Sequence, residues 1–487
     1  MPASRTSQPS VQAKATATHA RPLLLLSVLV GAGLVVSLVS TLGQPIIPAI
    51  AEDNDISAGA AQWTFTISML TGVMATPALG RLGDTARAKA ALLCSVGLVA
   101  VGALLAASVP SFTALLVGRA LQGVSLGIIP LTMAIARQQL PDRLVRPAVA
   151  VLSVTVVTGA GLGFPLTGII ADHHGYRATF WIGVALAAPT AVAVAVVVPR
   201  SRRQARGSFA LLESILLAGG LGLVLLVISQ ATAWHWAVLT GCVVTGTALV
   251  GGWALIAVRS PNPLVDLRLS TTRPVLAANV AAFFLGVGMY LATSLAIHVA
   301  QAPTGQAGLA ATVTATGFLI LPLSVASLLA NQFTRTLLGP RSPVLGLAAA
   351  IAGVGLCEIL LAVNRGSLIA IAVAMAVLGA ALGTAFALMP FVVLQHVPTE
   401  ETGGAMSLNL VLRHLGGAVG SAGGIGIATA VGLDTPAGYT TAFAVAAGLC
   451  LVAAGYVALT GHLERRRRPP AGPVRRLPAH LDGTQPM

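Results

Sequence analysis

The sequence has few charged residues and hardly any lysine. Asp, Glu, Lys and Arg together make up 9% of the 487 residues, hydrophobic residues make up 56%, and the mean hydropathy is +0.88. A water-soluble globule of this length needs far more polar surface than these residues provide. The composition therefore excludes a soluble protein and predicts a chain whose apolar segments face lipid.

Sequence motifs for nucleotide binding, catalysis and metal binding are also missing. The two lysines, Lys14 and Lys89, lie outside any GxxxxGK[ST] loop that could hold phosphates. No GxSxG, HExxH or paired-carboxylate arrangement occurs in a context that could support catalysis. The four cysteines follow no CxxC or Cys/His spacing. We therefore expect no enzyme, no nucleotide, no cofactor and no metal, and we expect an ion or substrate gradient to drive any work.

Acidic residues are scarce, with 14 Asp and Glu against 28 Lys and Arg, so the formal net charge is +14. Aromatic residues make up only 4%, and the basic residues form no patch, so we do not expect nucleic acid as a partner. Almost all basic residues lie in every second gap between long apolar segments. The positive-inside rule predicts this alternation for a chain that crosses a bilayer repeatedly, with anionic lipid at its inner face.

Breaks at charged, proline and Asn/Asp residues divide the chain into fourteen apolar segments, each long enough for the roughly 20 residues that a span requires. The predicted fold class is therefore an all-α membrane protein of fourteen transmembrane helices. The segments lie near residues 23–47, 61–82, 89–109, 112–137, 146–170, 177–198, 209–231, 235–258, 274–299, 306–330, 343–363, 367–391, 403–430 and 439–460.

The tails indicate the orientation of the chain. Residues 1–21 and 463–487 are both basic, which an even number of spans requires if both termini are cytoplasmic. The first apolar run exceeds the core of a signal peptide and no convincing cleavage site follows, so we expect it to stay in the mature protein. The preference for Arg over Lys, with abundant Ala, is typical of a GC-rich bacterial genome and predicts a multi-pass protein of a bacterial plasma membrane.

Four motifs resemble those of the major facilitator superfamily in order, spacing and membrane side. The third is similar to a motif of its drug/proton antiporters and the fourth to a segment common in the fourteen-helix branch. The motifs are GRLGD at 80–84, GRALQGVSLG at 118–127, GAGLGFPLTG at 159–168 and LRHLGGAVGSA at 412–422.

The resemblance covers about residues 22–462 and implies a major-facilitator-type 6+2+6 arrangement. Two six-helix bundles would rock against each other around a central cavity and so alternate access. The implied parts are an N-terminal cytoplasmic tail at 1–21, a six-helix bundle at 22–199, a two-helix insertion at 208–258, a second six-helix bundle at 270–462 and a basic, disordered cytoplasmic tail at 463–487.

The first motif has the residues of a conformational latch. Gly80 and Gly83 allow close helix approach. Asp84 can accept hydrogen bonds from the exposed N-terminal amides of a neighbouring helix or pair with Arg87. The alternative is a solvated loop carboxylate.

Arg119 is a guanidinium in the middle third of a predicted span, where a charge is costly and faces the interior or a wet cavity. Gln122 lies on the same helical face. The resemblance implies that Arg119 couples protonation to the change of shape. The alternative is a structural arginine that caps loose carbonyl groups.

The third motif combines small residues with a proline. Gly159, Gly161, Gly163 and Gly168 fall on and around one helical face, where small residues allow close packing, and Pro165 removes a backbone donor. The resemblance implies that Gly163 and Pro165 take part in gating where the two halves meet. The alternative is ordinary tight packing.

Only two acidic residues lie inside predicted spans. Glu358 is the better candidate for carrying a proton, because about five residues separate it from the outer end of its helix. We expect Glu213, near a cytoplasmic edge, to snorkel to water, and His298 to be an interfacial histidine. For Arg413 and His414 the sequence leaves two interpretations open, which are an ion pair with the cytoplasmic loops and a role in transport.

The first segment has Val39 where many fourteen-helix drug exporters carry a carboxylate, so a charge that attracts cations is missing. We therefore expect neutral or weakly charged amphiphiles as readily as cations. The candidates for lining the substrate cavity are polar or aromatic residues of the first, fourth, ninth and twelfth segments: Gln44, Arg119, Gln122, Asn279, Tyr290 and Phe386.

These features favour a proton-coupled exporter of small amphiphilic compounds or drugs, active in antibiotic resistance, whose partners are its substrate, protons and membrane lipid. One alternative is a metabolite importer or facilitator of the same fold, although few buried charges disfavour sugars or dicarboxylates. Another is a transport-dead membrane sensor, which is disfavoured because no soluble signalling module is evident.

Overall fold

The structure is a computed structural model that describes residues 11–42, 46–56, 58–200, 211–230, 234–260, 263–304, 308–334, 336, 343–432 and 435–467. In these ranges every regular element is a helix. In chain order the elements are α1 Val11–Thr41, α2 Ile47–Asp53, α3 Ala58–Gly83, α4 Ala88–Ser108, α5 Phe112–Gly123, η1 Val124–Gly127, α6 Ile128–Gln139, α7 Asp142–His174, α8 Tyr176–Val197, α9 Leu211–Gln230, α10 Trp236–Arg259, α11 Leu267–Ser270, α12 Arg273–Gln301, α13 Val313–Phe318, α14 Leu321–Phe333, α15 Pro343–Val363, α16 Leu368–His396, η5 Thr399–Glu401, α17 Thr402–Val431 and α18 Pro436–Arg467.

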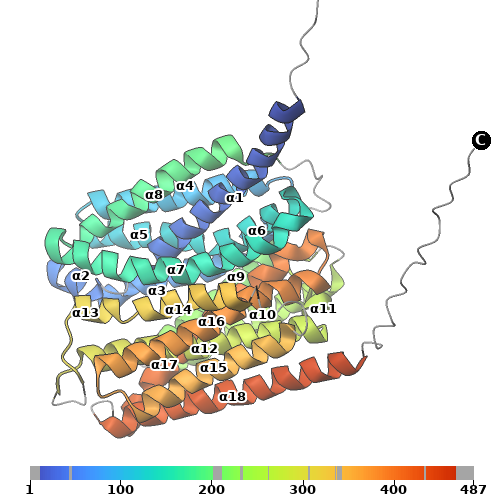
Figure 1. Ribbon diagram of the computed structural model, residues 1–487. Coiled ribbons are helices and arrows are strands. Elements are labelled where there is room, and N and C mark those ends of the chain that lie inside the picture. Colours follow the sequence, from blue (N-terminus) through green and yellow to red (C-terminus); the bar gives the residue numbers. More distant parts are fainter. Residues whose placement is uncertain are drawn as a thin grey trace, which may run out of the picture.

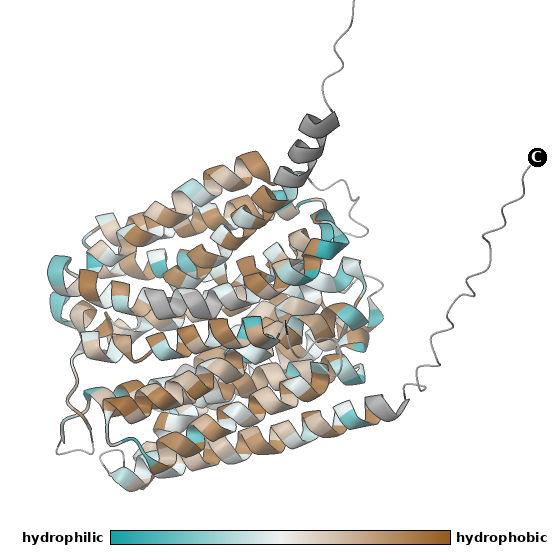
Figure 2. Cartoon of the chain, in the orientation of Figure 1, coloured by the Kyte–Doolittle hydropathy of each residue, from teal (hydrophilic) through white to brown (hydrophobic). Residues whose placement is uncertain are grey.

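Within the described residues, ten helical stretches are long and apolar enough to cross a membrane. Figure 2 shows hydrophobic residues along the lengths of the helices and hydrophilic residues gathered at both ends of the bundle. In lipid, a helix satisfies its backbone hydrogen bonds internally. The predicted all-α, multi-span class is therefore confirmed. The helices α3, α7, α9 and α17 coincide with the other predicted segments but are not among the ten, so length and hydropathy do not establish the count of fourteen.

The helices form two packed halves and an additional pair. In Figure 1 α1 to α8 lie in the upper half, and α12 to α18 lie in the lower half. The halves meet where α3 and α6 contact α17, and where α7 contacts α13, α14 and α16. The pair α9 and α10 pack on each other, and α9 also contacts α3 and α17. The start of α1 and the end of α18 lie at the same end of the bundle (Figure 1).

The predicted boundaries are wrong in two segments, the first and the tenth, whereas the fourth is confirmed as one apolar stretch, Phe112–Gln139, that contains a 3₁₀ turn. The first ends at Thr41, not near residue 47, and the chain starts a separate helix, α2, with Pro48 in its first turn, where a missing N–H costs nothing. Gln44 lies outside the described residues. The fourth segment passes through the 3₁₀ turn η1 between α5 and α6, and the tenth is divided into α13 and α14.

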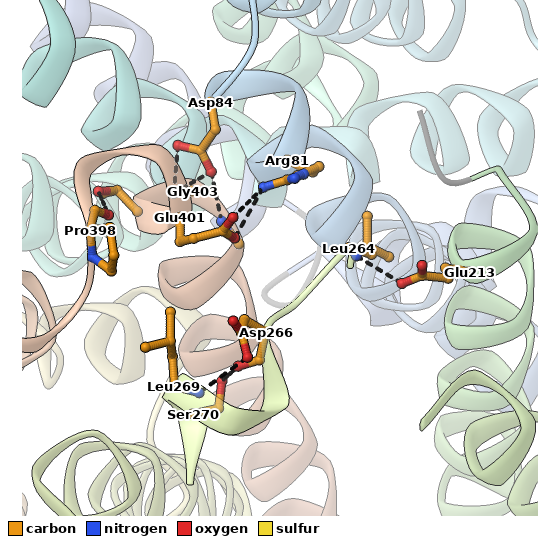
Figure 3. Close-up of polar contacts among 12 residues, drawn as sticks. Arg81, Asp84, Glu213, Leu264, Asp266, Leu269, Ser270, Pro398, Glu401 and Gly403 are labelled. Atoms are coloured by element: carbon orange, nitrogen blue, oxygen red, sulfur yellow. Dashed lines mark hydrogen bonds and ion pairs between the residues drawn. The ribbon is translucent and has the colours of Figure 1, made fainter. Parts of the chain in front are cut away.

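The prediction that Glu213 snorkels to water is also wrong. Its side chain is only 3% exposed, and its Oε2 accepts a hydrogen bond of 2.8 Å from the backbone N–H of Leu264 (Figure 3). The segment that follows α10 folds back over α9, so a backbone amide takes the place of water. His298 near the end of α12 is exposed, as an interfacial histidine should be.

The orientation of the chain can be tested at Asp53, which is exposed at the end of α2. In a variant without the four native cysteines, we expect Asp53→Cys to react with a membrane-impermeant thiol reagent added outside intact cells. Arg87→Cys is the control, because this exposed position precedes α4 at the opposite end of the bundle. It should react only after the membrane is opened, and the reverse pattern would show that the termini are outside.

Candidate functional site

A cavity lies between the two halves, and the centre of a water-sized sphere can occupy about 140 Å³ of it. Nineteen residues line it, and most are apolar or aromatic. The first half contributes residues of α1, α3, η1, α6 and α7, and the second contributes residues of α12, α14, α16 and α17. They are Val36, Ser37, Ser40, Phe65, Ser68, Met69, Leu126, Ile129, Phe164, Met289, Tyr290, Thr293, Ile297, Ile320, Leu323, Phe386, Leu410, Arg413 and His414.

The structure brings only some of the predicted cavity residues together. Tyr290 and Phe386 line the cavity, whereas Arg119, Gln122 and Asn279 are not among its lining residues. The Oδ1 of Asn279 accepts a hydrogen bond from Asn409 at a buried contact between α12 and α17. Helical periodicity identifies the buried faces of a helix but does not distinguish the face toward the cavity from faces toward neighbouring helices.

The cavity also contains charged and aromatic residues that the sequence interpretation did not assign to it. The Cζ of Arg413 lies 4.7 Å from the centre of the Phe386 ring, and His414, Phe65 and Phe164 are further lining residues. The proposed ion pair between Arg413 and the loops is not formed among the described residues. The feature of the sequence that could have identified Arg413 as a cavity residue is its position as a charged residue within an apolar segment.

Arg119 is fully buried and holds three helices together. Its Nε donates to the carbonyl of Thr64 in α3 at 3.2 Å, and its Nη1 donates to the carbonyl of Val39 in α1 at 3.2 Å. Nη1 also donates to Oε1 of Gln122 at 2.8 Å, and Nη2 has no partner among the described residues. These contacts are those expected of a carbonyl-capping arginine, and its role in coupling stays a prediction.

Glu358 is fully buried inside the second half, outside the lining of the cavity. Both carboxyl oxygens are without a hydrogen-bond partner in the described structure. A Cβ built on Gly288 of α12 would lie 3.7 Å from Oε1 of Glu358 and 3.2 Å from Sγ of Cys450 in α18. An ionised carboxylate without a partner is costly in such surroundings, so this side chain is most stable with a proton attached.

Gly163 and Pro165 are buried in α7, the helix of the first half that contacts α13, α14 and α16. A Cβ built on Gly317 would lie 3.7 Å from the Cα of Pro165, so this segment does reach the other half. The neighbouring glycines differ: Gly159 lies against Ser37 of α1, whereas Gly168 has nothing within 4 Å of a built Cβ. The gating role of Gly163 and Pro165 remains a prediction.

A set of polar contacts, which we call the inter-half clamp, joins the end of α3 to the start of α17. Gly403 N–H donates to both carboxyl oxygens of Asp84 at 2.9 Å, and Gly404 N–H donates to Oδ2 at 3.2 Å (Figure 3). Arg81 forms an ion pair of 3.0 Å with Glu401. Asp84 therefore accepts bonds from the N-terminal amides of a helix, where an anion is favoured, and does not pair with Arg87.

Two further features complete the inter-half clamp. Arg137 at the end of α6 donates to Oγ1 of Thr402 and to the carbonyl oxygens of Leu394 and Val397 in the second half. A Cβ built on Gly403 would lie 2.0 Å from the carbonyl oxygen of Gly80, so α3 and α17 touch backbone to backbone. The halves are thus joined by charge, hydrogen bonds and close packing at the end of the bundle where α1 begins.

Burial raises the pKa of the Asp84 carboxyl from 3.8 to about 8. The amides of Gly403 and Gly404 and the charge of Arg81 act in the opposite direction. In water this carboxyl would release its proton at a much lower pH. The closed clamp therefore binds a proton that an open clamp gives up.

Comparison with known proteins identifies the family. A model of the Major Facilitator Superfamily matches residues 29–208 and 275–485. The chain belongs to the major facilitator superfamily. It is a membrane transporter of that superfamily.

Individual relatives of this major facilitator protein are distant. A multidrug resistance protein B homolog of Mycobacterium tuberculosis is 26% identical over 373 residues, which are 74% of this chain and 67% of that protein. The multidrug efflux pump LfrA of Mycolicibacterium smegmatis is 27% identical over 415 residues, 84% of this chain and 81% of its own. The crystal structure of the POT family transporter PepTSo has a TM-score of 0.64 at 16% identity, covers 91% of this chain and 99% of its own, and shows the shared fold alone.

The protonation of Asp84 predicts how the clamp responds to pH. Because the closed clamp holds the proton and an opened, solvated carboxyl does not, closure should weaken as the pH rises from the ordinary pKa of 3.8 toward about 8, and it should change no further above 8. Labelling of Ser407→Cys, a buried position where α17 meets Gly80, reports opening in a variant without native cysteines. We expect labelling, corrected for the ionisation of the thiol itself, to accelerate as the pH rises toward 8 and to level off above it.

Two variants separate the charge of Asp84 from its hydrogen bonds. In Asp84→Asn, an amide oxygen at the position of Oδ2 still accepts from Gly403 and Gly404, so the clamp should stay closed and lose its pH response. Asp84→Ala loses these bonds, worth about 0.5–1.5 kcal/mol each, and should label faster at every pH. An unchanged pH response in Asp84→Asn would show that another group titrates.

The backbone contact of the clamp predicts the effect of one added methyl group. Gly403→Ala must push α17 away from Gly80, and overpacking of this kind costs about 1–3 kcal/mol. We expect a lower melting temperature and faster labelling of Ser407→Cys. Gly97→Ala in α4 is the matched control, because nothing lies within 4 Å of its built Cβ, and it should melt at the wild-type temperature or slightly above. Equal melting of both variants would contradict the contact.

Proposed function

We propose that this protein is a secondary active transporter that exports small amphiphilic compounds or drugs, in exchange for protons, by alternating access. The observation that carries the proposal is the apolar and aromatic cavity between two halves that are joined at one end by the inter-half clamp. Opening the clamp while the other end closes would expose the cavity to the other side of the membrane. The names of the mycobacterial relatives support drug efflux as its task.

We further propose fourteen spans in a 6+2+6 arrangement, as in the fourteen-helix drug/proton antiporters. The helices α3, α7 and α17 have 26, 33 and 30 residues, and α9 has 20, so each is long enough at 1.5 Å per residue to cross a hydrocarbon core of about 30 Å. The two ranges that match the family model leave out residues 209–274, where α9 and α10 lie. Both termini would then be on the cytoplasmic side of a bacterial plasma membrane, together with the inter-half clamp.

For the proton pathway we propose Glu358 as the carrier and Arg119 as the group that transmits its protonation to the first half. Glu358 has no partner for a negative charge, so its change of charge would alter the packing of α12, α15 and α18 around it. Arg119 ties α1, α3 and α5 together, so a strain on any of these helices reaches the others. Asp84, Gly163 and Pro165 would gate the movement where the halves meet.

The test is transport by the purified protein in proteoliposomes with an imposed pH gradient. We expect lipophilic test compounds to move against their own gradient while the pH gradient is dissipated. Arg119→Ala should abolish this movement, because the coupling group is lost and two buried carbonyls and Gln122 lose their hydrogen-bond donor. Glu358→Gln should leave only transport that does not depend on the pH gradient. Movement without coupling in the wild-type protein would favour a facilitator.

Stability must be measured beside transport, because the loss of a buried donor costs about 1–3 kcal/mol for each group left unsatisfied. If Arg119→Ala transports normally, the coupling role is wrong and Arg119 only caps carbonyls. If no compound moves for any variant that folds, the sensor alternative gains support.

A further inference from the structure

The cavity contains one guanidinium whose charge the described part of the chain does not balance. Arg413 is the twelfth of the 30 residues of α17 and lines the cavity. Its planar group lies over the Phe386 ring, at 4.7 Å from Cζ to the ring centre. No carboxylate forms an ion pair with it among the described residues, and the clamp acids Asp84 and Glu401 have partners of their own.

The polar groups around Arg413 do not supply a negative charge. The lining residues include no Asp or Glu, and besides Arg413 the titratable ones are His414 and Tyr290. Nδ1 of His414 is 2.8 Å from the carbonyl of Leu410, which can only accept, so this nitrogen carries a hydrogen. Glu358 is buried in the second half, away from the lining. The charge that the cavity presents is therefore positive.

Most of the hydroxyl groups at the cavity are already used within the protein. Ser37 donates to the carbonyls of Gly33 and Thr155, Ser40 donates to that of Val36, and Thr293 donates to that of Met289. Of the polar side chains left to meet a ligand, Arg413, His414 and Tyr290 belong to the second half, and Ser68 belongs to α3 of the first. A Cβ built on Gly417, one turn along α17, would lie 2.4 Å from Cδ2 of Tyr290, so only glycine there lets this phenol lie beside Arg413.

We propose that the cavity selects amphiphiles that carry an acidic group, with Arg413 as the counter-charge and Tyr290 as a second hydrogen-bond donor. A guanidinium at this depth is costly, and a bidentate pair with a carboxylate offsets that cost. Phe386 keeps the guanidinium in place by a cation–π contact. The apolar part of the ligand would pack against Met69, Met289 and Phe65, since thioethers adapt to different shapes. A cation would be repelled at the same place.

This inference rests on the proposed function, because it names the substrate class of the same cavity. The experiment measures equilibrium binding in nanodiscs, by fluorescence polarisation against empty nanodiscs, for three ligands with one apolar skeleton. These are pyrenebutyrate, pyrenebutanol and pyrenebutylammonium. At neutral pH we expect the carboxylate to bind wild-type protein about 10- to 100-fold more tightly than the alcohol. The ammonium should bind most weakly.

Variants of Arg413 assign the preference to this residue. Arg413→Gln should bring the carboxylate to the affinity of the alcohol, and Arg413→Lys should keep the preference in weakened form, because a lysine is a point charge without the planar fork. Arg146→Gln is the matched control. Arg146 also lies over a phenylalanine, Phe391, at 4.9 Å, but it is exposed and outside the cavity, so this variant should bind as wild type does.

The outcomes distinguish this inference from the proposed function. Equal binding of the three ligands to wild-type protein, or an unchanged preference in a folded Arg413→Gln, overturns the inference. Coupled transport in proteoliposomes without any preference for the acid supports the proposed exporter and overturns the proposal that the cavity selects acidic amphiphiles. A preference for the acid that depends on Arg413, with no transport of any ligand, supports the binding site and counts against the exporter.

Discussion

Lipid offers no hydrogen bonds, and this constraint decides which polar groups the interior of the protein can hold. The two buried charged groups whose partners are described solve the problem with backbone atoms. Arg119 donates to the carbonyls of two other helices, and Glu213 accepts from a backbone amide. Against this background, Glu358 and Arg413 stand out because no described residue neutralises either of them. A transporter has two mobile partners that can do so, a proton and a substrate.

The constraint also explains how the halves are held together. The contact surfaces within each half are mostly apolar, whereas the inter-half clamp joins the halves with the carboxyl group of Asp84 on helix amides, an ion pair and three bonds from Arg137. Bonds of this kind lie at the end of the bundle, where water can replace them when the halves part. A wholly apolar junction would expose apolar surface to water each time the halves part. A polar junction buried in the centre of the bundle would then leave polar groups without hydrogen-bond partners. Placement at the rim allows the contact to break at a moderate cost.

Much of the fold was predictable, because bilayer spans impose a length and loop charges reveal alternation. The glycines of the first motif and the acceptor role of Asp84 could be predicted for a similar reason: a carboxylate beside a helix start has few good partners. Other features depend on contacts between distant residues. The partner of Glu213 lies 51 positions away, and the carbonyl partners of Arg119 lie 55 and 80 positions away. Nothing in the local sequence marks them. The spacing predicts that Gln122 lies beside Arg119, but no helical pattern shows that Arg119 faces neighbouring helices while Arg413 faces the cavity.

The pair of helices α9 and α10 contacts both halves through α9. Glu213 of α9 is bonded to Leu264, and a Cβ built on Gly404 at the start of α17 would lie 3.0 Å from the carbonyl of that same residue. Toward the first half, α9 meets α3 through packing, where a Cβ built on Gly222 would lie 3.1 Å from the sulfur of Met74. Because α9 packs against α3 of the first half and also against α17 of the second, it covers the junction between the two halves on that flank.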